Sequence, residues 1–242
     1  MELPISNLQR FTSYFFEIIP HTFRQTVRFT LAAFFLFALP ALIGFRFGYV
    51  NPDIAPVLGL ETQREALADQ TTWTDIPVEQ RPYASAFIMS NNIRLAIAAF
   101  GGGMAFGLFA AYILVVNGVV IGAVLGLAFH YGLGMELLDF VFAHGWLELS
   151  VIFISGGAGL QIGTALIDPG RYSRRNAVNL AAQRAVPLMV IVIPALVVAG
   201  LIEGFVSPSS LSIPIKAGVG LATIIVLFGF LGFGGQSKSS AS

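Results

Sequence analysis

The chain has 242 residues, of which 56% are hydrophobic and 11% are charged, and its mean hydropathy is +0.80. Soluble domains carry about 25% charged residues, so this chain has too little polar surface for a water-soluble protein and is expected to lie in a bilayer. Its 13 basic and 13 acidic residues give no basic patch that could follow a nucleic-acid backbone, so nucleic acid is not an expected partner. The absence of cysteine excludes disulfides, thiol nucleophiles and thiolate metal sites.

Residues 1–27 are expected to remain attached as an N-terminal interfacial or cytoplasmic segment. A cleaved signal peptide has a basic start, a short apolar run and a small-residue cleavage site, whereas Glu2 and Glu17 stand here among bulky aromatic residues. Apolar side chains at helical spacing predict a helix in the membrane interface before Pro20, and a water-side helix packed on the bundle is the alternative. These apolar positions are Phe11, Tyr14, Phe15, Ile18 and Ile19.

Six segments are candidate membrane spans, since spanning takes roughly 20 apolar residues at a rise of about 1.5 Å each. We therefore predict an all-α, polytopic transmembrane helix bundle of about six spans, which forms one domain over residues 28–233 and is followed by a tail over 234–242. Asn117 and Gly118 predict the tight turn between the second and third spans, because both tolerate a positive φ. The spans are about 28–47, 94–116, 118–133, 147–167, 185–206 and 213–233.

Basic residues predict the orientation of the bundle. With six spans, most of them lie on the side of the two termini, most clearly in the short segment DPGRYSRRN that starts at Asp168. Cytoplasmic loops are enriched in Lys and Arg, so both termini are expected in the cytoplasm. The long connection over residues 48–93 then lies outside, and its EALADQ stretch allows a short helix. We interpret this connection as an external cap, with a solvated loop as the alternative.

Small residues recur at every fourth position in three places, which lets helix backbones approach closely. This pattern predicts that the second, third and fourth spans form the tightly packed centre, with the Phe-rich faces of the first and sixth spans toward lipid. Packing within one chain is expected, and a dimer contact is the alternative. The packing positions are Gly103, Gly107, Gly118, Gly122, Gly126, Gly159 and Gly163, completed by Ala99, Ala111 and Ser155.

Five polar residues from three predicted helices are expected at one depth near the outer leaflet. His144 and Glu148 stand four residues apart at the start of the fourth span, so a helix puts them on one face. Glu203 lies near the outer end of the fifth span, and Asn91 and Asn92 come just before the second. Ionisable groups at that depth are costly unless they are paired or face water, so the five residues are predicted to form one polar cluster.

The predicted cluster has four interpretations. Its members can satisfy one another and only fix helix positions, or they can line a groove for a substrate, an ion or a partner peptide. His144, Glu148 and Glu203 are also candidate metal ligands, although the spacing HxxxE is common and the second histidine of an HExxH helix is missing. The fourth interpretation is proton relay or hydrolysis, for which no serine or aspartate stands in a recognisable nucleophile motif. We predict no cofactor and no catalytic residue.

Several segments, taken in chain order, resemble the stage II sporulation protein M family of integral membrane proteins. They are SNNIR, VVNGVVIG, AHGWLELS, GGAGLQIG, DPGRYSRR and IEGFVSPS, within about residues 90–210, and the HGxxE and EGFxSP segments are the most specific. The resemblance implies a protein of the bacterial inner membrane. It also implies a membrane organiser, because the named member of the family works in an engulfment complex with peptidoglycan-degrading partners.

The expected function is therefore an integral membrane scaffold that organises partners in the cell envelope. A channel or transporter subunit that uses the polar cluster as its substrate or ion site is the alternative, and an intramembrane metalloenzyme is a third. The inner halves of the spans offer few ionisable groups for a water path, which favours the scaffold. Membrane lipid and envelope proteins are the expected partners, and a homo-oligomer is left open.

Overall fold

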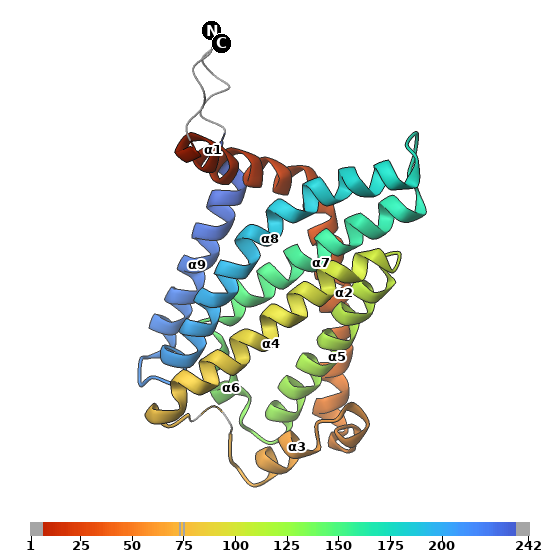
Figure 1. Ribbon diagram of the computed structural model, residues 1–242. Coiled ribbons are helices and arrows are strands. Elements are labelled where there is room, and N and C mark those ends of the chain that lie inside the picture. The colour runs from red at the N-terminus through yellow and green to blue at the C-terminus, as the bar shows by residue number, and fades with distance from the viewer. Residues whose placement is uncertain (1–6, 73, 75, 236–242) are drawn as a thin grey trace.

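The computed structural model describes residues 7–72, 74 and 76–235, and every regular element within them is helical. This confirms the predicted all-α bundle. The chain starts with α1 (Asn7–Ser13) and the π-helical turn η1 (Tyr14–Ile18), which continue into the long helix α2 (Ile19–Val50). Figure 1 shows α1 lying across one end of the bundle.

The rest of the described chain forms helices of very different length, joined by loops and short 3-10 turns. The helices are α3 (Glu61–Ala68), α4 (Arg81–Gly101), α5 (Leu108–His130), α6 (Gly134–Val141), α7 (Gly145–Ile167), α8 (Arg174–Phe205) and α9 (Ile213–Phe233). The 3-10 turns are η2 (Pro52–Ile54), η3 (Pro56–Leu58), η4 (Val78–Gln80) and η5 (Gly102–Met104).

Five helical segments of the described chain are long and apolar enough to cross a membrane, so this is a multi-pass membrane protein. α4 also runs between the two ends of the bundle, beside α7 and α8 (Figure 1). α4 is not one of these five segments, because its mean hydropathy is lowered by Asn91, Asn92 and Arg94. The apolar segments are Gln9–Val50, Leu108–His130, Gly145–Ile167, Arg174–Phe205 and Ile213–Phe233.

The two ends of the bundle differ in their short elements. α1 and the α7–α8 connection lie at one end, here called the α1 end, and α3 and α6 lie at the other, the α3/α6 end (Figure 1). α9 finishes at the α1 end, where the Arg24 guanidinium donates hydrogen bonds to the carbonyl oxygens of Leu231, Gly232 and Gly234. The last carbonyls of a helix lack partners within it, so Arg24 caps α9 and ties it to α2.

The boundary between α4 and α5 corrects the second and third predicted spans. The turn predicted at Asn117 and Gly118 is wrong, because both residues lie inside α5, where the Asn117 amide donates to the Ile113 carbonyl oxygen at 2.8 Å. The chain reverses instead over residues 102–107, which end at Gly107 with a φ of 76°. Glycine adopts this left-handed conformation without a side-chain penalty, so the reversal falls there.

The connection between α2 and α4 is shorter than predicted. α2 continues to Val50 and α4 already begins at Arg81, so residues 51–80 link them rather than 48–93. α3 lies in this connection and contains most of the EALADQ stretch. Leu67 of α3 is buried against apolar residues of α5 and α6, so the connection is folded onto the bundle.

The glycine series of α5 packs against α2. A side chain added at Gly118, Gly122 or Gly126 would overlap backbone carbonyl oxygens of α2, and Gly44 and Gly48 bring α2 equally close to the backbone of α5. Such contacts let two helices approach backbone to backbone. We predicted that the second, third and fourth spans form the tightly packed centre. In the structure the predicted first span, α2, also packs backbone to backbone against α5, because it has glycines of its own on that face.

α7 packs closely against the turn between α4 and α5. Gly103 and Gly107 of the turn lie against α7. An added side chain at Gly103, Gly159 or Gly163 would overlap neighbouring backbone, whereas one at Gly107 would lie 3.5 Å from Gly163 Cα. Ser155 of α7 also donates a hydrogen bond to a backbone carbonyl of α4 at 2.6 Å. Close packing and this buried hydrogen bond together fix α7 in the middle of the bundle.

Candidate functional site

Three ionisable side chains meet at the α3/α6 end, where α7 begins and α8 ends. His144 is the N-cap residue of α7, and Glu148 follows one turn later. Glu203 lies in the last turn of α8. One nitrogen of His144 and one oxygen from each carboxyl group all lie within 4.8 Å of one another. We call these three residues the His-Glu-Glu cluster.

The imidazole of His144 is held by two neighbours. Its Nδ1 forms a hydrogen bond of 2.8 Å with Ser207 Oγ, and its ring stands edge-on to Phe140 with the ring centroids 5.5 Å apart. Burial lowers the pKa of His144 to about 4, and a backbone hydrogen bond with Phe140 opposes this shift only in part. The imidazole is therefore neutral at pH 7.

Glu203 brings a buried carboxyl group to the same place. Its Oε1 lies 3.8 Å from His144 Nε2, which is longer than a hydrogen bond. No donor in the described part of the chain reaches the buried Oε2 of Glu203. Glu148 lies half-buried beside it. Two carboxyl groups so close in apolar surroundings need a proton or a cation between them.

The two asparagines predicted for the same cluster lie in the middle of α4 rather than just before a span, because α4 starts at Arg81. Asn92 is buried, whereas Asn91 is exposed on the surface of the bundle. α4 is joined to α8 through Ser85 instead, whose hydroxyl donates to a backbone carbonyl of α8 at 2.7 Å. The structure thus brings His144, Glu148 and Glu203 together, whereas Asn91 is exposed on α4.

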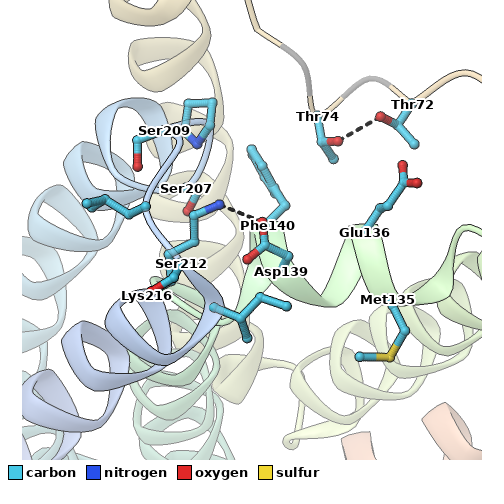
Figure 2. A pocket seen from close by; sticks show the side chains of 13 residues that line it. Thr72, Thr74, Met135, Glu136, Asp139, Phe140, Ser207, Ser209, Ser212 and Lys216 are labelled. Atoms are coloured by element: carbon cyan, nitrogen blue, oxygen red, sulfur yellow. Dashed lines mark hydrogen bonds and ion pairs between the residues drawn. The ribbon is translucent and has the colours of Figure 1, made fainter.

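A pocket of about 530 Å³ lies next to the His-Glu-Glu cluster. It is formed by Thr72 and Thr74 of the α2–α4 connection, by α6, by the α8–α9 loop and by the start of α9 (Figure 2). Two of its lining residues, Phe140 and Ser207, are the residues that hold His144. The cluster therefore lies directly behind the wall of the pocket.

An ion pair between a buried lysine and a partly exposed aspartate also lines this pocket. Lys216 Nζ donates to Asp139 Oδ2 at 2.6 Å and so joins the start of α9 to α6 (Figure 2). Lys216 is only 3% exposed. The sequence-based cluster did not include this pair or Ser207. One signal was available, because Lys216 is a lone cation near the start of an otherwise apolar span.

A protein-family model matches the part of the chain that contains the His-Glu-Glu cluster. The family model described as stage II sporulation protein M matches residues 33–208, which is well over half of the chain. Comparisons with curated proteins and with solved structures gave no match. The matched range runs from within α2 to the residue after Ser207 and so includes His144, Glu148 and Glu203. The chain therefore belongs to the stage II sporulation protein M family of integral membrane proteins.

Proposed function

We propose that the protein is an integral scaffold of the bacterial cytoplasmic membrane, which holds a protein partner of the cell envelope at its α3/α6 end. The pocket of about 530 Å³ at that end is the observation that carries the proposal. Hydroxyl groups make up much of its polar lining, and they both donate and accept hydrogen bonds, which suits a peptide backbone. These hydroxyls belong to Thr72, Thr74, Ser207, Ser209 and Ser212.

The distribution of basic residues supports an outward-facing pocket. The α7–α8 connection and the start of α8 carry Arg171, Arg174 and Arg175, and Arg10 belongs to α1, so all four lie at the α1 end. Segments rich in Lys and Arg stay on the cytoplasmic side of a membrane. In this orientation both ends of the chain are cytoplasmic, and the pocket faces the compartment in which envelope partners lie.

The distribution of buried charge favours a scaffold over a channel or transporter. Within the described residues, the buried ionisable side chains are His144, Glu203 and Lys216, and all three lie at the α3/α6 end. A path for ions or polar solutes has polar groups at its selective sites and must be wide enough for water or the solute to pass. Farther along α7, at Gly159 and Gly163, backbones pack on backbones and leave little room for water.

Site-specific photo-crosslinking in living cells tests the scaffold proposal. A photoreactive phenylalanine derivative is placed at Met135 or Ser209, which line the pocket, and at the control positions Leu221 or Ile225, which are exposed on α9. The pocket positions should give one protein adduct that the α9 positions do not. Mass spectrometry then identifies the adduct, and the purified partner should bind the purified chain.

Two results would refute the proposal. The first is that Met135 and Ser209 give only lipid adducts, as expected of the α9 positions. The second is that proteoliposomes containing the purified chain alone conduct an ion or solute, and that changes in the pocket abolish this flux. That result would identify a channel or transporter subunit.

A further inference from the structure

We infer that His144, Glu148 and Glu203 bind a divalent transition-metal ion, for which zinc is the best match. This inference goes beyond the scaffold role and does not depend on it. One imidazole nitrogen with two carboxylate oxygens is a ligand set that zinc accepts in sites with three protein ligands. The structure brings these three donor atoms within 4.8 Å of one another from the ends of two different helices.

The distances suit a single small ion. Ligand atoms around a tetrahedral zinc ion lie about 2.0–2.2 Å from it, and therefore about 3.4 Å from one another. His144 Nε2 and Glu203 Oε1 are 3.8 Å apart, so one ion can bridge them with a small side-chain adjustment. The wider limit of 4.8 Å for the whole set requires the glutamate side chains to close further around the ion.

The unpartnered oxygen of Glu203 is an independent indication that a ligand belongs here. Glu203 is 7% exposed, and its Oε2 is buried with no donor in the described residues. Most buried polar side-chain atoms in proteins have a hydrogen-bond partner, so an exception calls for an explanation. A cation bound between Glu203, Glu148 and His144 supplies the missing positive charge.

The contacts of His144 prepare it for this role. Metal-binding histidines usually engage their second ring nitrogen in a hydrogen bond with a neighbouring group, which sets the tautomer and the ring orientation. Ser207 Oγ engages Nδ1 at 2.8 Å, and this leaves Nε2 as the nitrogen that faces Glu203. Phe140 packs against the ring and limits its rotation.

A fourth ligand of the ion need not come from the chain. Three protein ligands leave one position of a tetrahedral ion to water or to a donor group of a partner. Phe140 and Ser207 belong both to the pocket wall and to the surroundings of His144, so the cluster lies next to the pocket at the α3/α6 end. The competing explanation is a proton shared within the cluster. A proton would also neutralise the carboxylates, but added zinc would then change neither the metal content nor the melting temperature.

Zinc binding by the purified full-length chain tests the inference. The protein in detergent is stripped with a chelator and dialysed against Zn²⁺, and its metal content and melting temperature are then measured. The wild type should retain about one zinc ion per chain and melt at a higher temperature with zinc than without it. His144→Ala and Glu203→Gln should lose both effects. The matched controls His130→Ala and Glu65→Gln, which change exposed residues at the same end of the bundle, should keep both.

A graded variant separates metal ligation from mere packing. Ser207→Ala should weaken zinc affinity about 10- to 100-fold, because it removes the partner that orients His144. Ser209→Ala changes a pocket residue outside the cluster and should leave the affinity unchanged.

If His144→Ala does not fold, the isosteric Glu203→Gln and the zinc titration of the wild type still decide whether the cluster binds zinc. A wild type that neither retains zinc nor melts differently with it would overturn the inference, and so would His144→Ala and Glu203→Gln variants that retain as much zinc as the wild type.

Discussion

Replacing Gly122 with alanine should force α5 away from α2 and lower the stability of the bundle. A Cβ at this position would lie 2.7 Å from the carbonyl carbon of Ala41 and closer still to its oxygen, whereas ordinary contacts begin at 3.4 Å. These atoms belong to the backbone, so no side chain can rotate out of the way. The two helices must therefore separate locally by about 0.7 Å or more.

The cost of this separation follows from two opposing effects. Overpacking by a single methyl group costs about 1–3 kcal/mol, while alanine gains about 0.5–1 kcal/mol over glycine in a helix. Backbone overlap places Gly122→Ala toward the upper part of that range, which leaves a net loss of about 2 kcal/mol. For a chain of this size, such a loss lowers the melting temperature by roughly 4–8 °C. Gly122→Leu should lower it further, because the larger side chain must also be accommodated.

The melting temperature of the purified protein in detergent, measured at one detergent concentration, checks this prediction. Gly229→Ala on α9 is the matched control, since a Cβ there meets nothing within 4 Å. The control should melt at the same temperature as the wild type or slightly higher, because alanine favours the helix. Equal changes in melting temperature for Gly122→Ala and Gly229→Ala would refute the close approach of α2 and α5.

Three further predictions concern orientation, helix capping and the ion pair of Lys216 and Asp139. Because the chain has no cysteine, a single cysteine at Thr72 should react with an impermeant maleimide in intact cells, and one at Ser173 should react only after permeabilisation; the opposite pattern would contradict the proposed orientation. Arg24→Gln should uncap the end of α9 and lower the free energy of unfolding by about 1–3 kcal/mol, with Arg24→Lys recovering only part; an unchanged melting temperature would exclude the capping role. Asp139→Asn should cost about 3–5 kcal/mol by leaving Lys216 buried and unpaired, whereas adding Lys216→Met should recover much of the loss; strictly additive losses in thermal unfolding would argue against the pair.

Hydropathy was sufficient to predict the helices whose residues are apolar almost throughout. α7 and α9 nearly coincide with the predicted spans 147–167 and 213–233, because both lipid and the bundle interior select apolar side chains. The same criterion failed for the first half of α4, which carries Asn91 and Asn92. α4 packs along α7 and α8, and these contacts bury part of its surface. A hydropathy average does not include such tertiary contacts.

Local turn chemistry was misleading at Asn117 and Gly118. In an aqueous loop, Asn followed by Gly favours a turn, because both residues tolerate a positive φ. In α5 the asparagine amide is satisfied by the carbonyl oxygen one turn earlier, and the glycine provides the close contact with α2. An Asn-Gly pair is compatible both with a turn and with a helix in close contact with its neighbour. The sequence alone therefore could not distinguish the two structures.

The candidate site depended on sequence spacing and on tertiary structure in different ways. Helical spacing was enough to expect His144 and Glu148 on one face, and the order of the spans was enough to expect Glu203 at a similar depth. Spacing could not supply Ser207 or Phe140, because their positions depend on how α6 and the α8–α9 loop fold across the α3/α6 end. Yet these two contacts are what distinguish the cluster from an ordinary HxxxE pair on a helix surface. They engage one imidazole nitrogen, limit the rotation of the ring and leave the other nitrogen facing a buried carboxyl group, and a metal ligand needs that orientation.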